Sequence, residues 1–376
     1  MGALLGEEST RATVAHATGS LWSHLATPAG TTQFSTVIMI YVLLRRKWDA
    51  SQYLDESIMS APPISEAPLH ARAQYLGAVP EYTKWRNYVC DCLDVLHWDA
   101  LSLSARAGGR ESPVSLHLHL SRLVILVPVR ELLEYSFIHI RAGVSSNLLP
   151  HNVYQPPRPG QHWRRTLLTW AHQDRYKARL AVVHAGALFW HVRRYASCSF
   201  MEPFGVFLAA LVLWAFGSAS GTVDLERQHF GPAAAQTQNA EQHAPTPAPS
   251  RADVNLLVSA SPASVLQHDD HYRTGSEASP AALSSSSSVQ RTSLPSTQRR
   301  RMPNVVHLDR PLDDELVQHF IRSGDGMRLC LEGVDDLCCG EGPFQVLREA
   351  IGILLEQPVV WSVSETYAEY LESMIS

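Results

Sequence analysis

The chain has few charged residues, and its acidic residues outnumber its basic ones. Charged residues make up 18% of the 376 positions, below the ~25% that is typical of soluble proteins. Lysine and arginine total 31 against 36 aspartates and glutamates, so the net charge is −5. Domains that coat nucleic acid through bulk charge usually have a pI above ~9. The composition therefore argues against that class, although it leaves room for a local basic patch.

Cysteine is also scarce, with six residues in the whole chain. Cys90 and Cys92, like Cys338 and Cys339, are too close in sequence for an easy bridge, and the spacing forms no disulfide framework. A reducing, intracellular compartment is the natural interpretation. The N-terminal MGALLGEESTR lacks the apolar run of a signal peptide, and Gly6 stands where a myristoylation signal needs Ser or Thr.

Several catalytic and metal-binding motifs are missing from the sequence. There is no phosphate loop with Lys-Ser/Thr, no GxGxxG and no G-x-S-x-G elbow. No Cys and His residues have the spacing of a two-Cys/two-His zinc finger. Cys90 and Cys92 with His97 provide too few ligands and favour a core helix, and His268 with His271 favours a solvated polar patch. We therefore expect no catalytic residues, no cofactor and no metal ligands in this chain.

Two acid pairs and one histidine pair remain as candidates for chemistry. Asp313–Asp314 and Asp335–Asp336 suggest, as an alternative, an all-helical enzyme that uses a divalent metal. Carboxylates also stabilise the first turn of a helix, which is the preferred interpretation of Asp313–Asp314, and a turn or helix start is preferred for Asp335–Asp336. His184 and His191 are seven residues apart, too far for one metal ion without other ligands. We expect them to be core or boundary histidines with hydrogen-bond partners.

The longest apolar run is Phe204–Phe216, FGVFLAALVLWAF. At ~1.5 Å per residue it spans roughly 20 Å as a helix, which is short of the ~30 Å hydrocarbon core of a membrane. Glu202 and Pro203 precede it and the polar SASGT follows. It therefore predicts a buried core helix, and a membrane-associated protein is kept as an alternative.

Composition divides the chain into four segments. Residues 1–33 are expected to be a flexible N-terminus, 34–217 a helical regulatory domain, 218–303 a disordered Ala/Ser/Pro-rich insert, and 304–376 the C-terminal part of the same domain. Helical periodicity predicts seven to nine helices and no strand with sustained alternation. The fold class is therefore all-α, interrupted by a long low-complexity insert.

Individual signals place several helix ends. The helix that begins at Phe34 is expected to end in the basic turn Arg45–Lys47, and Pro128 should kink or break the helix that follows Pro113. Ser362 and Glu365 form the pattern of a capping box before the last helix.

The only candidate signal in the insert is the basic run Arg299, Arg300 and Arg301. A nuclear-import receptor could bind such a run. Three arginines are a weak signal, and a merely solvating run is an equally good interpretation.

Four stretches resemble a known family. They are HLHLSRLVILVPVRELLEYS, RYKARLAVVHAGALFWHVRRYASCSFMEPFGVFLAALVLWAFG, VVHLDRPLDDELVQHFIRSGDGMRLCLEGVDDLC and the terminal WSVSETYA. In their order and apolar character they are similar to the fungal-specific transcription factor domain. This domain is also called the xylanolytic-activator regulatory or middle homology domain, and the version resembled here follows paired two-Cys/two-His zinc fingers. The resemblance runs from about Phe34 to the end of the chain, apart from the insert.

The resemblance implies an all-helical regulatory domain of a nuclear transcription factor that acts on RNA polymerase II transcription. Its expected partners are the transcription machinery or other regulatory proteins, with no membrane, and a homo-oligomer is left open. In that family zinc and base-specific DNA contact belong to the fingers, which this chain lacks. The fingers were lost, or they lie upstream of Met1, so zinc and direct DNA binding are expected only with them. The family has no catalytic residues to carry over.

We predict that the purified chain shows no sequence preference for duplex DNA at physiological salt. Sequence specificity needs side chains at base edges, whereas phosphate contacts only position a protein. The basic runs in this chain are small and far apart, and should give at most salt-sensitive binding of order 10⁻⁴ to 10⁻⁶ M. A binding-site selection experiment tests this, and enrichment of a motif that random DNA does not compete away would contradict it.

Overall fold

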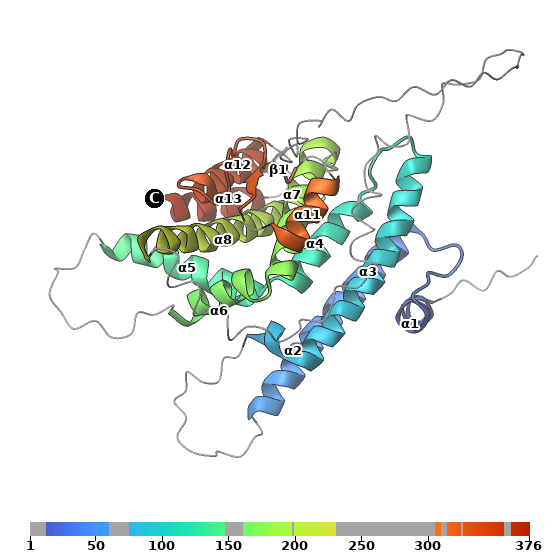
Figure 1. The fold of residues 1–376 in the computed structure, drawn as a ribbon. Coiled ribbons are helices and arrows are strands. Elements are labelled where there is room, and N and C mark those ends of the chain that lie inside the picture. Colours follow the sequence, from blue (N-terminus) through green and yellow to red (C-terminus); the bar gives the residue numbers. More distant parts are fainter. Residues whose placement is uncertain are drawn as a thin grey trace, which may run out of the picture.

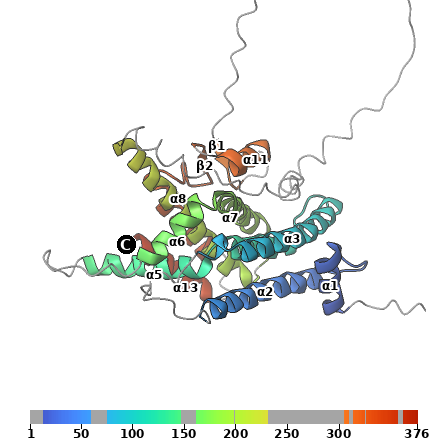
Figure 2. The same ribbon diagram turned by 60° about the horizontal axis from the view of Figure 1, so that its bottom comes forward.

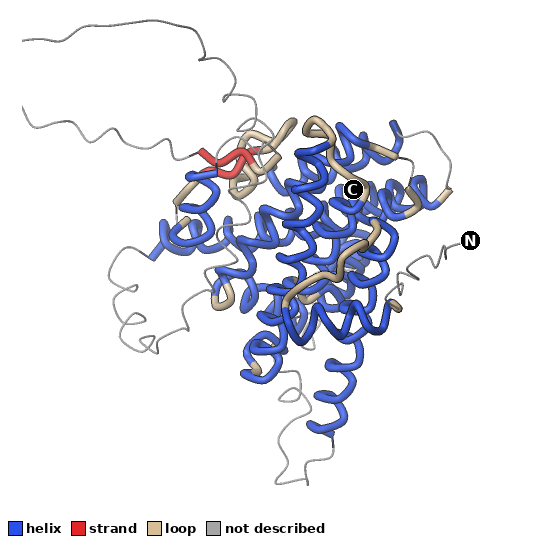
Figure 3. The backbone as a smooth tube through the Cα atoms, turned by 90° about the vertical axis from the view of Figure 1, so that its right-hand side faces the viewer, coloured by secondary structure: helices blue, strands red, loops and turns tan. Residues whose placement is uncertain are grey.

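A computed structural model describes residues 13–59, 75–146, 161–197, 199–230, 305–309, 314–324, 326–356 and 362–376. Within these ranges the fold is all-α, as predicted, with eleven α-helices and one small sheet of two strands. Figure 1 shows α5, α7, α12 and α13 around α8, with α1, α2 and α3 to one side of that group, and Figure 3 shows the two strands at the edge of the helical body.

The N-terminal helices are α1 (Val14–His24), α2 (Gln33–Met59) and α3 (Pro80–Arg106), with a short 3₁₀ turn at Leu76–Ala78 before α3. α2 packs against α1 and α3, and Figure 2 shows α2 and α3 running side by side. The expectation of a flexible segment over residues 1–33 is wrong for α1. Thr13 caps this helix by accepting a hydrogen bond from the His16 N–H at 3.2 Å, and Leu21 is completely buried.

The basic run Arg45–Lys47 does not end α2, which continues to Met59. Arg45 Nε forms an i,i+4 ion pair with Asp49 Oδ1 at 3.1 Å, and Lys47 Nζ donates to the carbonyl oxygen of Val124 on α4. Arg45 therefore pairs along the side of α2, and Lys47 binds the neighbouring helix α4. Neither residue marks the C-terminal end of α2.

The central helices are α4 (Val114–Leu126), α5 (Val129–Ser146), α6 (Gln161–His172), α7 (Arg175–Tyr195) and α8 (Met201–Phe230). α4 and α5 are separated at Val127 and Pro128, as predicted, because proline cannot supply the N–H that a continuous helix needs. α4 packs on α7, and α7 packs on α8.

The apolar run Phe204–Phe216 lies in α8 and forms the centre of the core, as predicted. Every residue from Val206 to Phe216 is buried. By length and composition the segment Met201–Gly221 could cross a membrane. However, 78% of its apolar stretch is buried inside the protein. The expected boundary at residue 217 is wrong, because α8 continues to Phe230, and residues 231–303 of the expected insert lie outside the described residues.

The C-terminal segment contains β1 (Val305–His307), α11 (Asp314–Ser323), β2 (Arg328–Cys330), α12 (Gly342–Glu356) and α13 (Val363–Ile375). β1 and β2 pair in parallel, with Val306 opposite Leu329. The sequence did not predict these strands, because three residues are too few for a visible alternation. Arg179 of α7 is charged yet only 5% exposed, because α11 packs against α7.

The expected capping box of the last helix is not formed. Ser362 has helical backbone angles (φ −56°, ψ −15°) and its side chain makes no cap hydrogen bond. An N-cap normally needs an extended backbone so that its oxygen can reach the next turn. On α13, Leu371 and Met374 are buried in the core. Tyr367 of the same helix is half-buried and stacks on Phe207, with ring centroids 4.5 Å apart.

Two glycines let the C-terminal segment approach the central helices closely. A Cβ atom at Gly186 of α7 would overlap the carbonyl oxygen of Leu308, and one at Gly217 of α8 would overlap that of Leu337. Arg193 adds ion pairs across the same contact, with Nη1 3.2 Å from Asp309 Oδ2 and Nη2 2.8 Å from Glu349 Oε2. The parts of the chain before and after the insert therefore pack into one body.

We expect Gly186→Ala to lower the free energy of unfolding by about 1–3 kcal/mol, because the added methyl group must displace the Leu308 backbone. Gly352→Ala in α12 is the matched control. Nothing lies within 4 Å of its added Cβ, and alanine should stabilise that helix by ~0.5–1 kcal/mol. Urea unfolding of the two purified variants measures both changes, and an unchanged Gly186→Ala protein would contradict the close contact.

Candidate functional site

Among the acidic and basic candidates, Asp314 and the pair Asp335–Asp336 lie in the part of the chain that the structure describes. Arg299, Arg300 and Arg301 lie outside the described residues, as do Asp313, His268 and His271. Asp335–Asp336 lies in the turn after β2, where Asp336 Oδ1 accepts from the Cys338 N–H at 3.1 Å and its Oδ2 lies 3.6 Å from Arg328 Nε. This is the predicted turn. In the described part of the chain, no group of three or more His, Cys, Asp and Glu residues could hold a metal ion.

His184 and His191 are buried and have hydrogen-bond partners, as predicted. His184 is 3% exposed, and its Nδ1 lies 3.0 Å from Nδ1 of His119 on α4. His191 is 1% exposed, and its Nδ1 lies 2.7 Å from Glu111 Oε2 in the α3–α4 connection. The predicted core position of Cys90 and Cys92 on α3 is confirmed as well.

The structure adds His97 of α3 to this group. Its ring meets that of His119 edge-on, with centroids 5.4 Å apart and an interplanar angle of 88°. His97, His119 and His184 form what we call the histidine cluster, with one residue from each of α3, α4 and α7. Sequence spacing could not reveal the cluster, because its members are far apart in the chain and only helix packing brings them together.

Burial keeps the histidine cluster neutral. It lowers the pKa of His97 to about 4, although the Glu111 carboxylate opposes this effect. Burial also lowers the pKa of His119 and of His184 well below the ordinary value, and nearby histidines add to both shifts. At pH 7 the Nδ1–Nδ1 contact is therefore a hydrogen bond between two uncharged rings, one donating and the other accepting.

Buried ion pairs tie the same helices together. Arg122 of α4 pairs with Asp94 of α3, and both side chains are under a tenth exposed. Arg86 Nη1 of α3 lies 2.6 Å from Asp174 Oδ2 at the start of α7, and the Tyr75 hydroxyl donates to the same oxygen at 2.7 Å. These contacts link α3 to α4 and to the start of α7 through buried charged groups.

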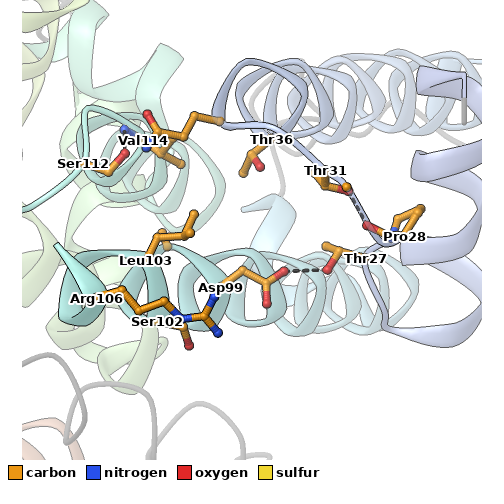
Figure 4. Close-up of a pocket in the computed structure, with 13 residues that line it drawn as sticks. Thr27, Pro28, Thr31, Thr36, Asp99, Ser102, Leu103, Arg106, Ser112 and Val114 are labelled. Carbon is orange, nitrogen blue, oxygen red and sulfur yellow. Dashed lines mark hydrogen bonds between the residues drawn. The ribbon is translucent and has the colours of Figure 1, made fainter. Parts of the chain in front are cut away.

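An open cleft of about 200 Å³ lies at the edge of this core (Figure 4). The α1–α2 connection and the start of α2 form one wall, and the C-terminal half of α3 with the start of α4 forms the other. Its polar lining consists of hydroxyl, amide and charged side chains from Thr27, Thr31, Gln33, Thr36, Asp99, Ser102, Arg106 and Ser112. No sequence motif marked these residues, since their spacing matches no known ligand-binding pattern.

The cleft and the buried polar core are adjacent along the chain. Asp99 follows His97 by two residues on α3, and Ser112 directly follows Glu111, the partner of His191. Thr27 Oγ1 donates to Asp99 Oδ2 at 2.5 Å across the cleft, and Figure 4 shows this bond. The cleft is therefore lined by polar groups, and one hydrogen bond already spans it.

Comparison with known proteins returns no relative: no protein-family model, no curated protein and no solved structure matches the chain.

The histidine cluster predicts that stability is lost as the pH falls from about 6.5 to about 4. In this window the unfolded chain binds protons at its histidines, whereas folded His97 takes up a proton only near pH 4. The free energy of unfolding therefore decreases as the pH decreases, by up to about 1.4 kcal/mol per pH unit for each such histidine. Above pH 6.5 the neutral histidines cause no further change in the free energy of unfolding.

Urea unfolding at a series of pH values measures this effect. His97→Gln should flatten the pH dependence, because it removes one group that titrates differently in the two states. His24→Gln is the control, since His24 is exposed at the end of α1. An identical pH slope for His97→Gln and the parent protein would contradict the assignment.

Proposed function

We propose that this chain is the regulatory domain of a fungal nuclear transcription factor and modulates RNA polymerase II transcription through contacts with other proteins. The observation that carries the proposal is the packing of the stretches that resemble the family. Three of the four stretches lie in α4 and α5, in α7 and α8, and in the segment from β1 to the turn after β2, and the described residues of the fourth lie at the start of α13. The insert separates the last two stretches from the first two. Even so, α4 packs on α7, α7 on α8 and α11 on α7.

The same packing favours one regulatory body over a string of independent helices. The glycine contacts and the Arg193 ion pairs join the residues before the insert to those after it. A domain of this kind binds partners through its surface, because its interior is filled. In this proposal base-specific DNA contact and zinc belong to zinc fingers of the kind that the family carries, and the basic run Arg299–Arg301 is the candidate nuclear-import signal.

A reporter assay tests the proposal. The full chain is fused to a heterologous zinc-finger DNA-binding domain and expressed in yeast with a reporter gene that carries binding sites for those fingers. One reporter has these sites alone, and a second also has sites for an independent activator. We expect transcription to rise or fall at least severalfold relative to the DNA-binding domain alone. Leu211→Asp should abolish the effect, because it places an unpaired charge in the core of α8, whereas the exposed Lys84→Gln should retain it.

An unchanged reporter in both arrangements, with the fusion protein expressed in the nucleus at the level of the control, would contradict the proposal. An equal effect from the Leu211→Asp fusion would contradict it as well, since the folded domain would then not be responsible.

A further inference from the structure

The cleft between α2 and α3 contains two opposite charges that do not neutralise each other. Asp99 and Arg106 both line it from α3, yet no ion pair joins them or links Arg106 to any other carboxylate of the described residues. Thr27 occupies only Oδ2 of Asp99, and Oδ1 makes no hydrogen bond within the same described part. A carboxylate oxygen and a guanidinium are therefore both available to a ligand in one small space.

Three hydroxyl groups of the cleft present acceptors to a ligand, because their own protons are already donated within the protein. Thr27 gives its proton to Asp99, Thr31 gives its proton to the Pro28 carbonyl at 2.7 Å, and Ser102 gives its proton to the Trp98 carbonyl at 2.9 Å. Each oxygen keeps lone pairs after donating. Together with Asp99 they make a wall that favours a ligand rich in N–H or O–H donors.

The donors of the cleft lie on another part of its lining. Arg106 carries five N–H groups in a planar fork that suits a carboxylate, and its side chain extends back along α3 in the direction of Asp99 (Figure 4). Ser112 accepts from the Val114 N–H at 3.2 Å, so its own hydroxyl proton remains for a ligand. The cleft thus offers an acceptor region and a donor region side by side.

The size of the cleft limits what can fill both regions. Its volume of about 200 Å³ is below the ~300–1,000 Å³ of drug-sized sites. A cleft of this volume suits a molecule of only a few non-hydrogen atoms. A small α-amino acid has this size, and it carries an ammonium group and a carboxylate close together.

We propose that this cleft binds a small zwitterionic α-amino acid. The ammonium group lies against Asp99 Oδ1 and the threonine oxygens, and the carboxylate lies against Arg106 and the Ser112 hydroxyl. The carbon skeleton packs on the apolar part of the lining, to which Ala100 and Val114 contribute. This proposal stands on the cleft alone and does not depend on the transcriptional role.

Isothermal titration of the purified full chain with L-serine tests the proposal. We expect saturable one-to-one binding. N-acetyl-L-serine removes the ammonium charge and L-serine amide removes the carboxylate, so each should bind at least tenfold more weakly than L-serine. Glycerol, which carries hydroxyl groups without either charge, should not bind measurably.

Charge-neutralising variants locate the site. Asp99→Asn and Arg106→Gln should each weaken L-serine binding at least tenfold. Their matched controls are Glu81→Gln and Lys84→Gln, which remove exposed charges near the opposite end of α3 and should bind as the parent protein does. Circular dichroism of every variant confirms that the helical fold is retained.

Three results would overturn the proposal. They are an absence of L-serine binding at millimolar concentration, equal binding of L-serine and its two blocked forms, and equal binding to the parent protein and to both α3 charge variants. The comparison of the three serine compounds uses the parent protein only, so it stays decisive even if a variant fails to fold. Failure here would leave the reporter assay of the proposed function unaffected.

Discussion

The rest of the fold depends on the need to cover α8. An α-helix that is apolar on all sides cannot leave any face in water, and every side chain from Val206 to Phe216 is buried here. α7, α12, α13 and α4 make most of the contacts that cover it, with α5 and α6 on the remaining sides. Because α12 and α13 follow the insert, burial of the apolar surface of α8 brings into contact parts of the chain that are far apart in sequence. The glycine contacts at Gly186 and Gly217 then allow that approach at the level of the backbone.

Several polar groups inside this arrangement pair across helices. The histidine cluster connects α3, α4 and α7 without charge, because burial holds its members in the neutral form. Arg122 and Asp94 connect α3 to α4 as an ion pair, and removing either partner would leave the other charge buried and uncompensated. At the edge of this core lies the cleft between α2 and α3. There α3 and the start of α4 face the α1–α2 connection, which supplies Thr27 and Thr31.

Local rules predicted much of the helical content. The apolar run around Leu211 indicated a core helix, and Pro128 indicated the break between α4 and α5, because both effects act within a few residues. The same rules failed where distant contacts decide. Residues 1–33 were expected to be flexible, yet burial of Leu21 stabilises α1. Arg179 of α7 is charged, but it is buried because α11 covers that side of α7 from beyond the insert. Ser362 has the right neighbours for a capping box and the wrong backbone angles.

The sequence by itself determined that the protein is helical, that Phe204–Phe216 is a buried core helix, and that His184 and His191 are core or boundary residues with hydrogen-bond partners. Periodicity and hydrophobicity are properties of neighbouring residues, so they can be read along one helix. Only the tertiary structure decided that His97 and His119 join His184, and that Asp99 and Arg106 share a cleft with threonines of the α1–α2 connection. These sites arise where several helices meet, and the crossing of two helices depends on the summed packing of whole surfaces, which no local spacing of residues encodes.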